Sequence, residues 1–189
     1  MGSLIRVARD ARGAGVADEE ITADVESFVA FYAAEYRAVL TFAASLCRDL
    51  HAAEDVTQDA FIAAQRRWSK LQSFDRPDLW VRRVVANRSV SRWRRLVSDE
   101  RRIHKLAQLR QPEGDAAAHH DDVGIWRLVR QLPPRQAQVI ALTYLEDRPL
   151  ADVASVLGIS IETAKTHLQR GRTALARAIE READAEDVQ

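Results

Sequence analysis

The sequence predicts an all-α protein made of two small helical domains that are joined by a flexible linker. Three observations predict this fold class. Apolar residues recur at spacings of three and four over long stretches, which is the pattern of helices packed along one side. The segment Pro149–Ala176 has the pattern of two short helices around a tight turn. Between residues 97 and 122 the periodicity is lost, and the second half, QPEGDAAAHHDD, is polar and turn-prone.

Charge is distributed unevenly along the chain. The 189 residues are enough for one large domain or two small ones, and 28 basic residues balance 28 acidic ones. Residues 18–59 nevertheless hold ten acidic and two basic residues, whereas residues 76–110 hold eleven basic and three acidic ones. This asymmetry indicates two surfaces for two partners, one of them a nucleic acid.

The sequence also bears on where the protein works. Cys47 is the only cysteine, so an intramolecular disulfide is excluded. The N-terminus lacks the apolar core of a signal peptide, and no run reaches the ~18 apolar residues of a membrane span. We therefore expect a cytoplasmic protein without direct membrane insertion.

We expect a disordered N-terminal extension at residues 1–24, because this segment lacks periodicity, and the first domain after it. A long helix follows from Phe28, and Asp49 is placed to cap a second helix at about residues 51–68. One face of the second helix is an acidic strip that includes an aliphatic residue, Ile62. Spacing alone fits two interpretations of the strip equally well, a solvated helix face or a docking surface for a basic helical partner.

A proline-containing loop at residues 71–78 leads into a helix predicted from about residue 77 to residue 96. Val81, Val84 and Val85 form its expected core, while arginines crowd the rest together with Trp80, Trp93, Asn87 and Ser91. Cations for phosphate, rings for stacking and amides for base edges suit a nucleic-acid strand. The alternative, in which the tryptophans are buried and the arginines solvated, fits Trp93 better than it fits the arginines, namely Arg82, Arg83, Arg88, Arg92, Arg94 and Arg95.

The second predicted domain begins near Val123 and ends with the helix-turn-helix. Gly158 can adopt the left-handed conformation at the turn, and Ser160 is a natural N-cap for the next helix. The outer face of that helix offers polar groups that can contact phosphates and base edges in a major groove. The alternative is a plain amphipathic hairpin with a solvated face. The outer residues are Glu162, Thr163, Lys165, Thr166, Gln169, Arg170 and Thr173.

We expect no catalytic residues, no metal, no cofactor and no small-molecule substrate. No cluster of Asp, Glu and His has metal spacing, and no nucleophile lies beside a base, which disfavours a nuclease or another enzyme. His119 to Asp122 are adjacent in the sequence, and adjacent side chains in a flexible segment rarely bind the same metal ion. A dimeric operator-binding regulator would account for the helix-turn-helix but not for the acidic strip or the arginine-rich helix.

Three stretches, in their order and spacing, resemble the extracytoplasmic-function (group 4) sigma factors of bacterial RNA polymerase. AEDVTQDAFIAAQRRW at residues 53–68 is similar to that family's polymerase-docking helix. PDLWVRRVVANRSVSRWRR at residues 77–95 is similar to its promoter −10 helix. The stretch from LPPRQ to RTAL, residues 132–175, is similar to its −35-binding domain.

The resemblance implies sigma domain 2 at residues 25–97, a linker at 98–122, sigma domain 4 at 123–180 and an acidic tail at 181–189. It implies a promoter-specificity subunit that binds core polymerase, recognises −10 and −35 elements and promotes strand opening for transcription initiation. The implied partners are the clamp helices and flap of core RNA polymerase, promoter DNA and an anti-sigma factor.

The resemblance also implies the site residues. Those for polymerase binding are Glu54, Asp55, Gln58, Asp59, Phe61, Ile62 and Gln65. Those for the −10 element are Ser73, Phe74, Asp75, Arg76, Trp80, Arg83, Asn87, Arg88, Ser91, Arg94 and Arg95. Those for the −35 element are Ser160, Glu162, Thr163, Lys165, Thr166, His167, Gln169, Arg170 and Arg172.

Four positions depart from the family pattern in the recognition helix. Ala164 replaces a preferred valine, which should loosen packing. Gly171 replaces an alanine, at an expected cost of about 0.5–1 kcal/mol in a helix interior. Thr166 and His167 replace a common Ser-Arg pair, so the family pattern does not predict which −35 sequence the chain recognises.

Overall fold

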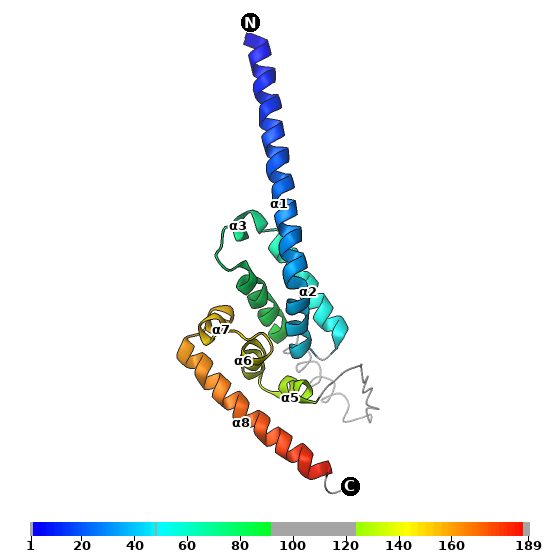
Figure 1. Cartoon of the computed structure of the whole chain (residues 1–189), viewed down its shortest axis with the longest axis vertical. Helices are drawn as coiled ribbons and strands as arrows, with labels where there is room; N and C mark the ends of the chain where they lie inside the picture. The colour runs from blue at the N-terminus through cyan, green and yellow to red at the C-terminus, as the bar shows by residue number, and fades with distance from the viewer. Residues whose placement is uncertain (1, 48, 92–123, 187–189) are drawn as a thin grey trace, which may run out of the picture.

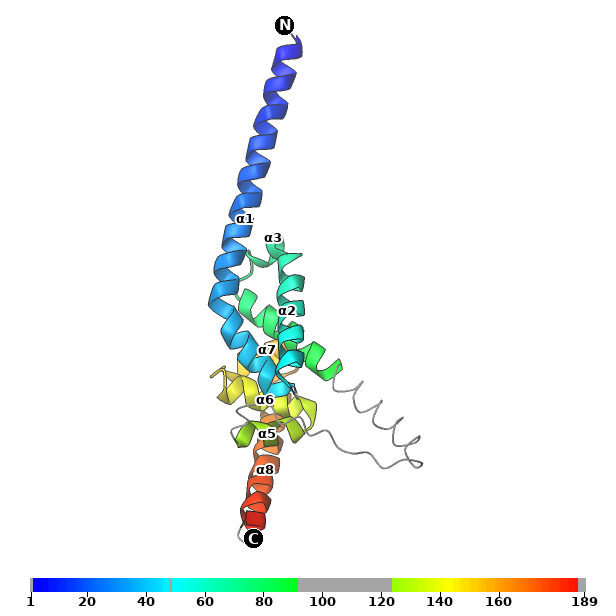
Figure 2. The ribbon, with the colours of Figure 1, turned by 90° about the vertical axis from the view of Figure 1, so that its right-hand side faces the viewer.

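Two helical bundles pack against each other between two projecting helices. The computed structural model describes the backbone of residues 2–47, 49–91 and 124–186, and the side chains of residues 22–184 within these ranges. All regular structure in these ranges is helical. Helix α1 (Gly2–Leu46) projects beyond the bundles at one end, and helix α8 (Ile161–Glu186) extends toward the other end (Figures 1 and 2).

Helix α1 differs from the sequence-based expectation at its start. It is continuous from Gly2, through the segment that we expected to be a disordered extension. Alanine, arginine and glutamate recur there, and these residues lose little on joining a helix that is already nucleated by the packed part of the chain. The packed part begins near Phe28, and farther along Val39, Phe42 and Ala43 are completely buried.

Helix α2 (Leu50–Gln65) begins as predicted, because the carboxylate of Asp49 accepts a hydrogen bond from the backbone amide of Ala52 at 2.6 Å. It ends earlier than predicted, and a separate short helix, α3 (Trp68–Leu71), follows. A further helix, which has no label in Figure 1, occupies residues 77–91. The predicted continuation of that helix to residue 96 and the predicted linker at 98–122 lie outside the described residues.

The second bundle consists of α5 (Ile125–Gln131), α6 (Pro134–Tyr144), α7 (Leu150–Leu157) and α8. A proline occupies the first turn of α6, where its missing amide costs nothing. Helix α8 packs against α5, α6 and α7. The short turn before α7 contains Asp147, which has a positive φ of 49°.

The apolar core continues from one bundle into the other. Helix α1 contacts both α5 and α6. Val39 and Val85 of the first bundle belong to the same buried cluster as Leu142 and Val153 of the second. A smaller cluster, which includes Leu128 and Leu175, lies under α8. In this structure the shared core therefore holds the candidate surfaces of the two bundles in one fixed arrangement.

Candidate nucleic-acid interface

The acidic strip of α2 faces outward. Its polar residues are half-buried or exposed, and the aliphatic side chain of Ile62 is 45 % exposed. The negative charges lie along a helix that is held in place by its opposite, fully buried face, which includes Ala53, Ala60 and Ala64. An acidic helix face with an exposed aliphatic residue can pair with a basic helical surface.

Phe61 differs from the expectation that it belongs to the docking surface. Its side chain is 3 % exposed. Its ring packs edge-on against Tyr32, with 4.8 Å between the ring centroids, and lies near Phe31 and Tyr36. One position beyond Ala60, it falls on the same inward face of the helix. Phe61 therefore supports the strip from beneath.

The expected −10 surface combines the loop after α3 with one side of helix 77–91. Ser73, Phe74 and Asp75 are exposed, and the ring of Phe74 is 43 % exposed. Asn87 and Ser91 are also exposed and lie one turn apart, with the Ser91 hydroxyl donating to the Asn87 carbonyl at 3.1 Å. An exposed ring and an exposed amide on neighbouring segments can stack with a base and read its edge.

Trp80 and Arg88 connect this surface to its surroundings. Trp80 is half-buried, and the guanidinium of Arg67 lies over its ring at 5.9 Å from the centroid. Arg88 forms an exposed ion pair with Asp59 of α2 at 2.6 Å. The expected docking strip and the expected −10 surface therefore meet at this ion pair. Arg94 and Arg95, also expected on the −10 surface, lie outside the described residues.

The helix-turn-helix has the predicted local chemistry. Gly158 ends α7 in the left-handed conformation, with φ 64° and ψ 39°. The hydroxyl of Ser160 accepts a hydrogen bond from the backbone amide of Thr163 at 3.1 Å, which caps α8. Ala164 is completely buried where α8 crosses α7, so its small side chain suits a close helix contact. The start of α8 is thereby fixed in angle and position.

The outer face of α8 is open. Its expected −35 residues are exposed except for His167, and an open groove of about 510 Å³ runs beside Lys165, Gln169 and Arg172. The ammonium group of Lys165 pairs with Glu162 at 2.8 Å. Surface pairs of this kind contribute only about 0–1 kcal/mol, so the pair can yield to a phosphate or a base. The exposed residues are Ser160, Glu162, Thr163, Lys165, Thr166, Gln169, Arg170 and Arg172.

His167 has a different environment from the rest of that set. It is half-buried, its Nδ1 atom is buried, and Nδ1 has no hydrogen-bond partner among the described residues. Burial lowers the pKa of His167, and the positive charges of Arg170 and Arg135 lower it further. The His167 side chain is therefore less accessible to a partner than the other expected −35 residues.

The match to known families follows the same two bundles. A family model described as Sigma-70 region 2 matches residues 31–98, and one described as Sigma-70, region 4 matches residues 123–175. The ECF RNA polymerase sigma factor SigW of Bacillus subtilis is 28 % identical over 69 % of this chain and 77 % of its own length. The chain belongs to the extracytoplasmic-function sigma factors. It is a promoter-recognition subunit of RNA polymerase.

Other relatives cover more of this sigma factor. The RNA polymerase sigma-E factor of Streptomyces coelicolor is 28 % identical over 84 % of the chain and 95 % of its own length. The ECF RNA polymerase sigma factor SigM of Mycobacterium tuberculosis is 25 % identical over 84 % of the chain and 80 % of its own length. Among the described residues, no helix of the sigma factor is long and apolar enough to cross a membrane.

Two solved structures share the fold of this sigma factor. The sigma factor RpoE of Bartonella quintana, solved in complex with the anti-sigma factor NepR, superposes with a TM-score of 0.61 at 22 % identity. It covers 82 % of this chain and 98 % of that one. CnrH, solved in complex with the cytosolic domain of CnrY, superposes with a TM-score of 0.57 at 24 % identity and covers 82 % of this chain and 88 % of that one.

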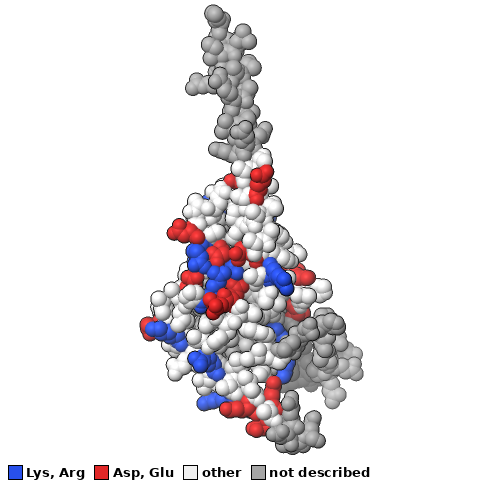
Figure 3. Space-filling view, in the orientation of Figure 1, with Lys and Arg blue, Asp and Glu red and all other residues white. Residues whose placement is uncertain are grey.

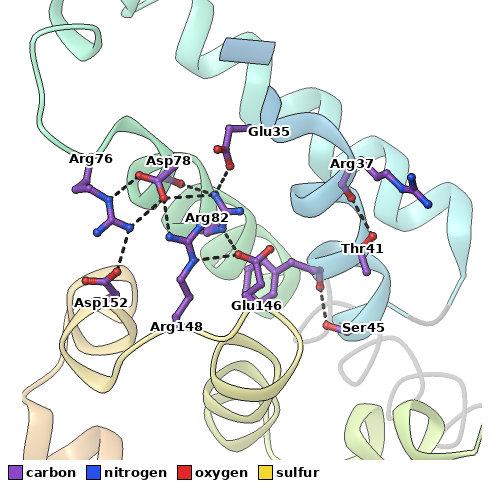
Figure 4. A network of polar contacts seen from close by, with 11 residues as sticks. Glu35, Arg37, Thr41, Ser45, Arg76, Asp78, Arg82, Glu146, Arg148 and Asp152 are labelled. Carbon is purple, nitrogen blue, oxygen red and sulfur yellow. Dashed lines mark hydrogen bonds and ion pairs between the residues drawn. The ribbon is translucent and has the colours of Figure 1, made fainter. Parts of the chain in front are cut away.

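A network of charged residues joins the two domains of the sigma factor, and sequence patterns did not reveal it (Figure 4). Arg82 is 1 % exposed, although it belongs to the arginines that we expected on the surface. It contacts Glu35 of α1 at 2.7 Å and also Glu146 of the second domain. Burial opposes the charge of Arg82, yet hydrogen bonds and the charges of Glu146 and Glu35 raise its pKa. The i, i+4 spacing of Asp78 and Arg82 was the only local signal of the network.

Asp78 lies at the centre of the same network. Burial alone would raise the pKa of Asp78, but the hydrogen bond from Arg76 and the charges of Arg148 and Arg82 hold that pKa below its ordinary value. The Arg148 guanidinium of the second domain lies 2.8 Å from the Asp78 carboxylate. Figure 3 shows acidic and basic side chains gathered together in the middle of this face of the molecule.

Proposed function

We propose that this sigma factor divides promoter recognition among three surfaces. The acidic strip of α2 docks on the basic clamp helices of core polymerase. The loop at residues 73–75 and helix 77–91 hold an unpaired −10 strand. The start of α8 reads the −35 element as intact duplex, while its domain also contacts the flap. The chain has no catalytic step of its own, and polymerase performs the chemistry.

The observation that carries this proposal is the open face of α8 above its capped start. A single helix fits a major groove, and in a helix-turn-helix the N-terminal part of the second helix meets base edges. Lys165, Thr166 and Gln169 are exposed on that part and are offered to the bases. Arg170 and Arg172 are exposed beside them and suit phosphates.

The −10 surface has a different task. An extruded base costs a few kcal/mol in lost stacking and pairing, which new stacking and edge contacts must offset. Phe74 offers an exposed ring, and Asn87 offers an exposed amide that can both donate and accept. We propose that these two groups capture a base of the opened strand, with Ser91 beside them.

Single-round transcription with purified core polymerase tests this division of labour. Asn87→Ala should slow strand opening about tenfold while duplex binding changes little, because one base-edge contact is worth about 1–3 kcal/mol. Lys165→Ala should weaken binding through the −35 element to a similar degree. Asp55→Ala should weaken assembly with core polymerase. Equal effects of all three substitutions on a single step would contradict the proposal.

Three matched control variants remove the same kinds of functional group from positions outside the three proposed surfaces. Gln131→Ala removes an exposed amide of α5, Arg177→Ala removes an exposed cation farther along α8, and Glu180→Ala removes an exposed carboxylate. These variants should initiate like the wild type. The operator-binding alternative makes the opposite prediction for the wild type, since it requires a dimer that binds duplex DNA tightly without polymerase.

We further propose that the protein works in the cytoplasm and is held inactive by an anti-sigma factor. The complexes of RpoE with NepR and of CnrH with CnrY, which share this fold, support the second part. A tagged copy purified from its own cells should carry, besides core polymerase, one further protein in equal amount. Adding that protein to the transcription assay should stop initiation, and an inert protein would refute this part of the proposal.

A further inference from the structure

Building on the base capture proposed above for Phe74 and Asn87, we propose that Arg67 and Lys70 bind the backbone phosphates of the same unpaired strand. Neither residue belongs to the expected −10 set. Both lie at α3, beside the loop at residues 73–75 and close to helix 77–91 in the chain's fold (Figure 1).

Arg67 lies beside the aromatic ring near the start of helix 77–91. It is exposed at the turn between α2 and α3, and its guanidinium lies 5.9 Å from the centroid of the Trp80 ring. Trp80 and Asn87 are seven residues apart, about two turns, so they share one side of their helix. A guanidinium that rests on a ring keeps its N–H donors at its edge, where a phosphate can accept from them. Arg67 therefore places a phosphate donor in line with Trp80 and Asn87.

Lys70 places a second cation next to the loop. It is exposed and follows Arg67 by three residues, a spacing that puts both on one side of a helical turn. The backbone carbonyl of Lys70 accepts hydrogen bonds from the Ser73 amide at 3.4 Å and from the Ser73 hydroxyl at 2.8 Å. The loop is thus tied to Lys70 directly before Phe74. A nucleotide captured at Phe74 would have this ammonium group beside its phosphate.

The charges of Arg67 and Lys70 suit a nucleic acid better than a protein partner. Within the described ranges neither residue forms an ion pair, whereas Arg76 and Arg88 do. A basic partner that fits the acidic strip of α2 would repel both cations. A DNA strand carries a negative phosphate at every nucleotide and would attract them. The exposed cations at α3 therefore extend the −10 surface rather than the docking strip.

Arg66 offers a matched control for this assignment. It precedes Arg67 in the sequence, carries the same charge and is also exposed. It lines a groove with Val25 and Val29 of α1 instead of contacting Trp80. A general effect of removing one positive charge from this region should therefore appear in Arg66→Ala as well, whereas a specific phosphate contact should not.

The experiment measures how strand binding depends on salt. Each full-length variant is assembled with core polymerase at a saturating concentration of sigma factor, and assembly is checked separately because Arg67 follows the docking strip closely in the chain. Anisotropy of a short fluorescent single-stranded DNA of mixed sequence then gives the affinity at several salt concentrations. The slope of log affinity against log salt concentration counts the phosphate contacts.

Arg67→Ala and Lys70→Ala should each lower the affinity about fivefold to tenfold at about 50 mM salt. Each should reduce the steepness of the slope by about 0.7, which is the value for one phosphate contact with a single strand. Arg67→Lys keeps the charge and should keep most of the slope, and Arg66→Ala should leave the slope unchanged. An unchanged slope in either alanine variant at position 67 or 70, or an equal reduction in Arg66→Ala, would overturn the inference. A lower affinity with an unchanged slope would mean that Arg67 only supports the Trp80 ring.

Asn87→Ala in the same assay separates the phosphate contacts from the proposed base capture. It removes a neutral amide, so it should lower the affinity without changing the slope. If Asn87→Ala has no effect while the variants at Arg67 and Lys70 reduce the slope, the strand backbone binds at α3 and the base capture fails. If Asn87→Ala lowers the affinity while those variants keep the wild-type slope, the base capture stands and the phosphate contacts fail.

Discussion

His167 illustrates how a single side chain of the recognition helix can serve folding instead of contact. Its Nδ1 atom is buried near α6, and burial and two arginines lower its pKa from 6.5. The unfolded chain therefore binds more protons than the folded one as the pH falls from 6.5 toward that lowered pKa. Acidification through this window must destabilise the second domain.

We predict that the melting temperature falls between pH 7 and pH 5, and that His167→Gln removes most of this fall. Thermal melts followed by circular dichroism at several pH values measure it. His51→Gln replaces a histidine of α2 whose side chain is 85 % exposed and should leave the slope as it is. A variant at position 167 with the wild-type slope would contradict the assignment.

Single residues were predictable where their role is local. Asp49, Gly158 and Ser160 act on the backbone within a few positions of themselves, so residue type and place were enough. Phe61 and His167 were expected to face partners, but each faces inward. Periodicity shows which face of a helix is buried but not where that face ends. For a residue at its border, the neighbouring helices decide whether the side chain is buried or exposed.

At the scale of elements, the crossing of α6 over α8 explains the unusual glycine. A Cβ atom at position 171 would lie 3.0 Å from Cγ1 of Ile140 and 3.4 Å from Cβ of Gln136. Ile140 is 2 % exposed and has little room to move. The absence of a side chain at Gly171 thus lets the two helices approach closely, a benefit that helix propensity alone does not include.

We predict that Gly171→Ala lowers the free energy of unfolding by about 1 kcal/mol. Propensity favours alanine by about 0.5–1 kcal/mol, but overpacking a tight core contact typically costs about 1–3 kcal/mol. Urea denaturation measures the difference. Thr173→Ala, an exposed position in the same helix, should be neutral or slightly stabilising. A clear gain in stability from Gly171→Ala would show that the contact yields easily.

The order of the helices in the described ranges was predictable from the sequence, but the separate helix α3 and the helix ends were not. Helix α2 stops at Gln65, and Trp68 begins a new helix in which it is 6 % exposed. Its indole nitrogen donates to the hydroxyl of Ser27 at 2.7 Å. A straight continuation of α2 would change the direction of this side chain, so a tertiary contact coincides with the break. No local pattern announces such a contact.

At the scale of the whole molecule, the contact between the two domains could not be predicted from the sequence. Each amphipathic helix reveals which face is apolar, but not which other helix covers it. Arg82 lies in the same arginine-rich stretch as several exposed arginines. It is buried because it pairs with Glu35 and Glu146, which lie on distant segments of the chain. Two helical domains were therefore foreseen, whereas their packing against each other was not.

The contact between the two domains should respond to acid, and the lowered pKa of Asp78 determines the direction of that response. Its folded pKa lies below 3.8, because Arg76, Arg148 and Arg82 favour the carboxylate. The stabilisation from this group is complete above its unfolded pKa of ~3.9 and is lost as the pH falls through the lower folded pKa. Contact between Asp78 and Arg148 across the domain boundary should therefore be constant from pH 8 to about pH 5.

We predict a constant fluorescence energy transfer between dyes at Ser69→Cys of the first domain and Glu180→Cys of the second, in a Cys47→Ala background, over that range. A decrease should begin only below about pH 4. Asp78→Asn should reduce the part of the decrease that precedes unfolding, since the amide carries no charge to lose. Far-ultraviolet circular dichroism on the same samples separates opening from loss of helix. If the energy transfer began to decrease near neutral pH, a group other than Asp78 would control the contact between the domains. In that case the charged boundary would respond to ordinary changes in cellular pH, which an interface anchored by Asp78 should resist.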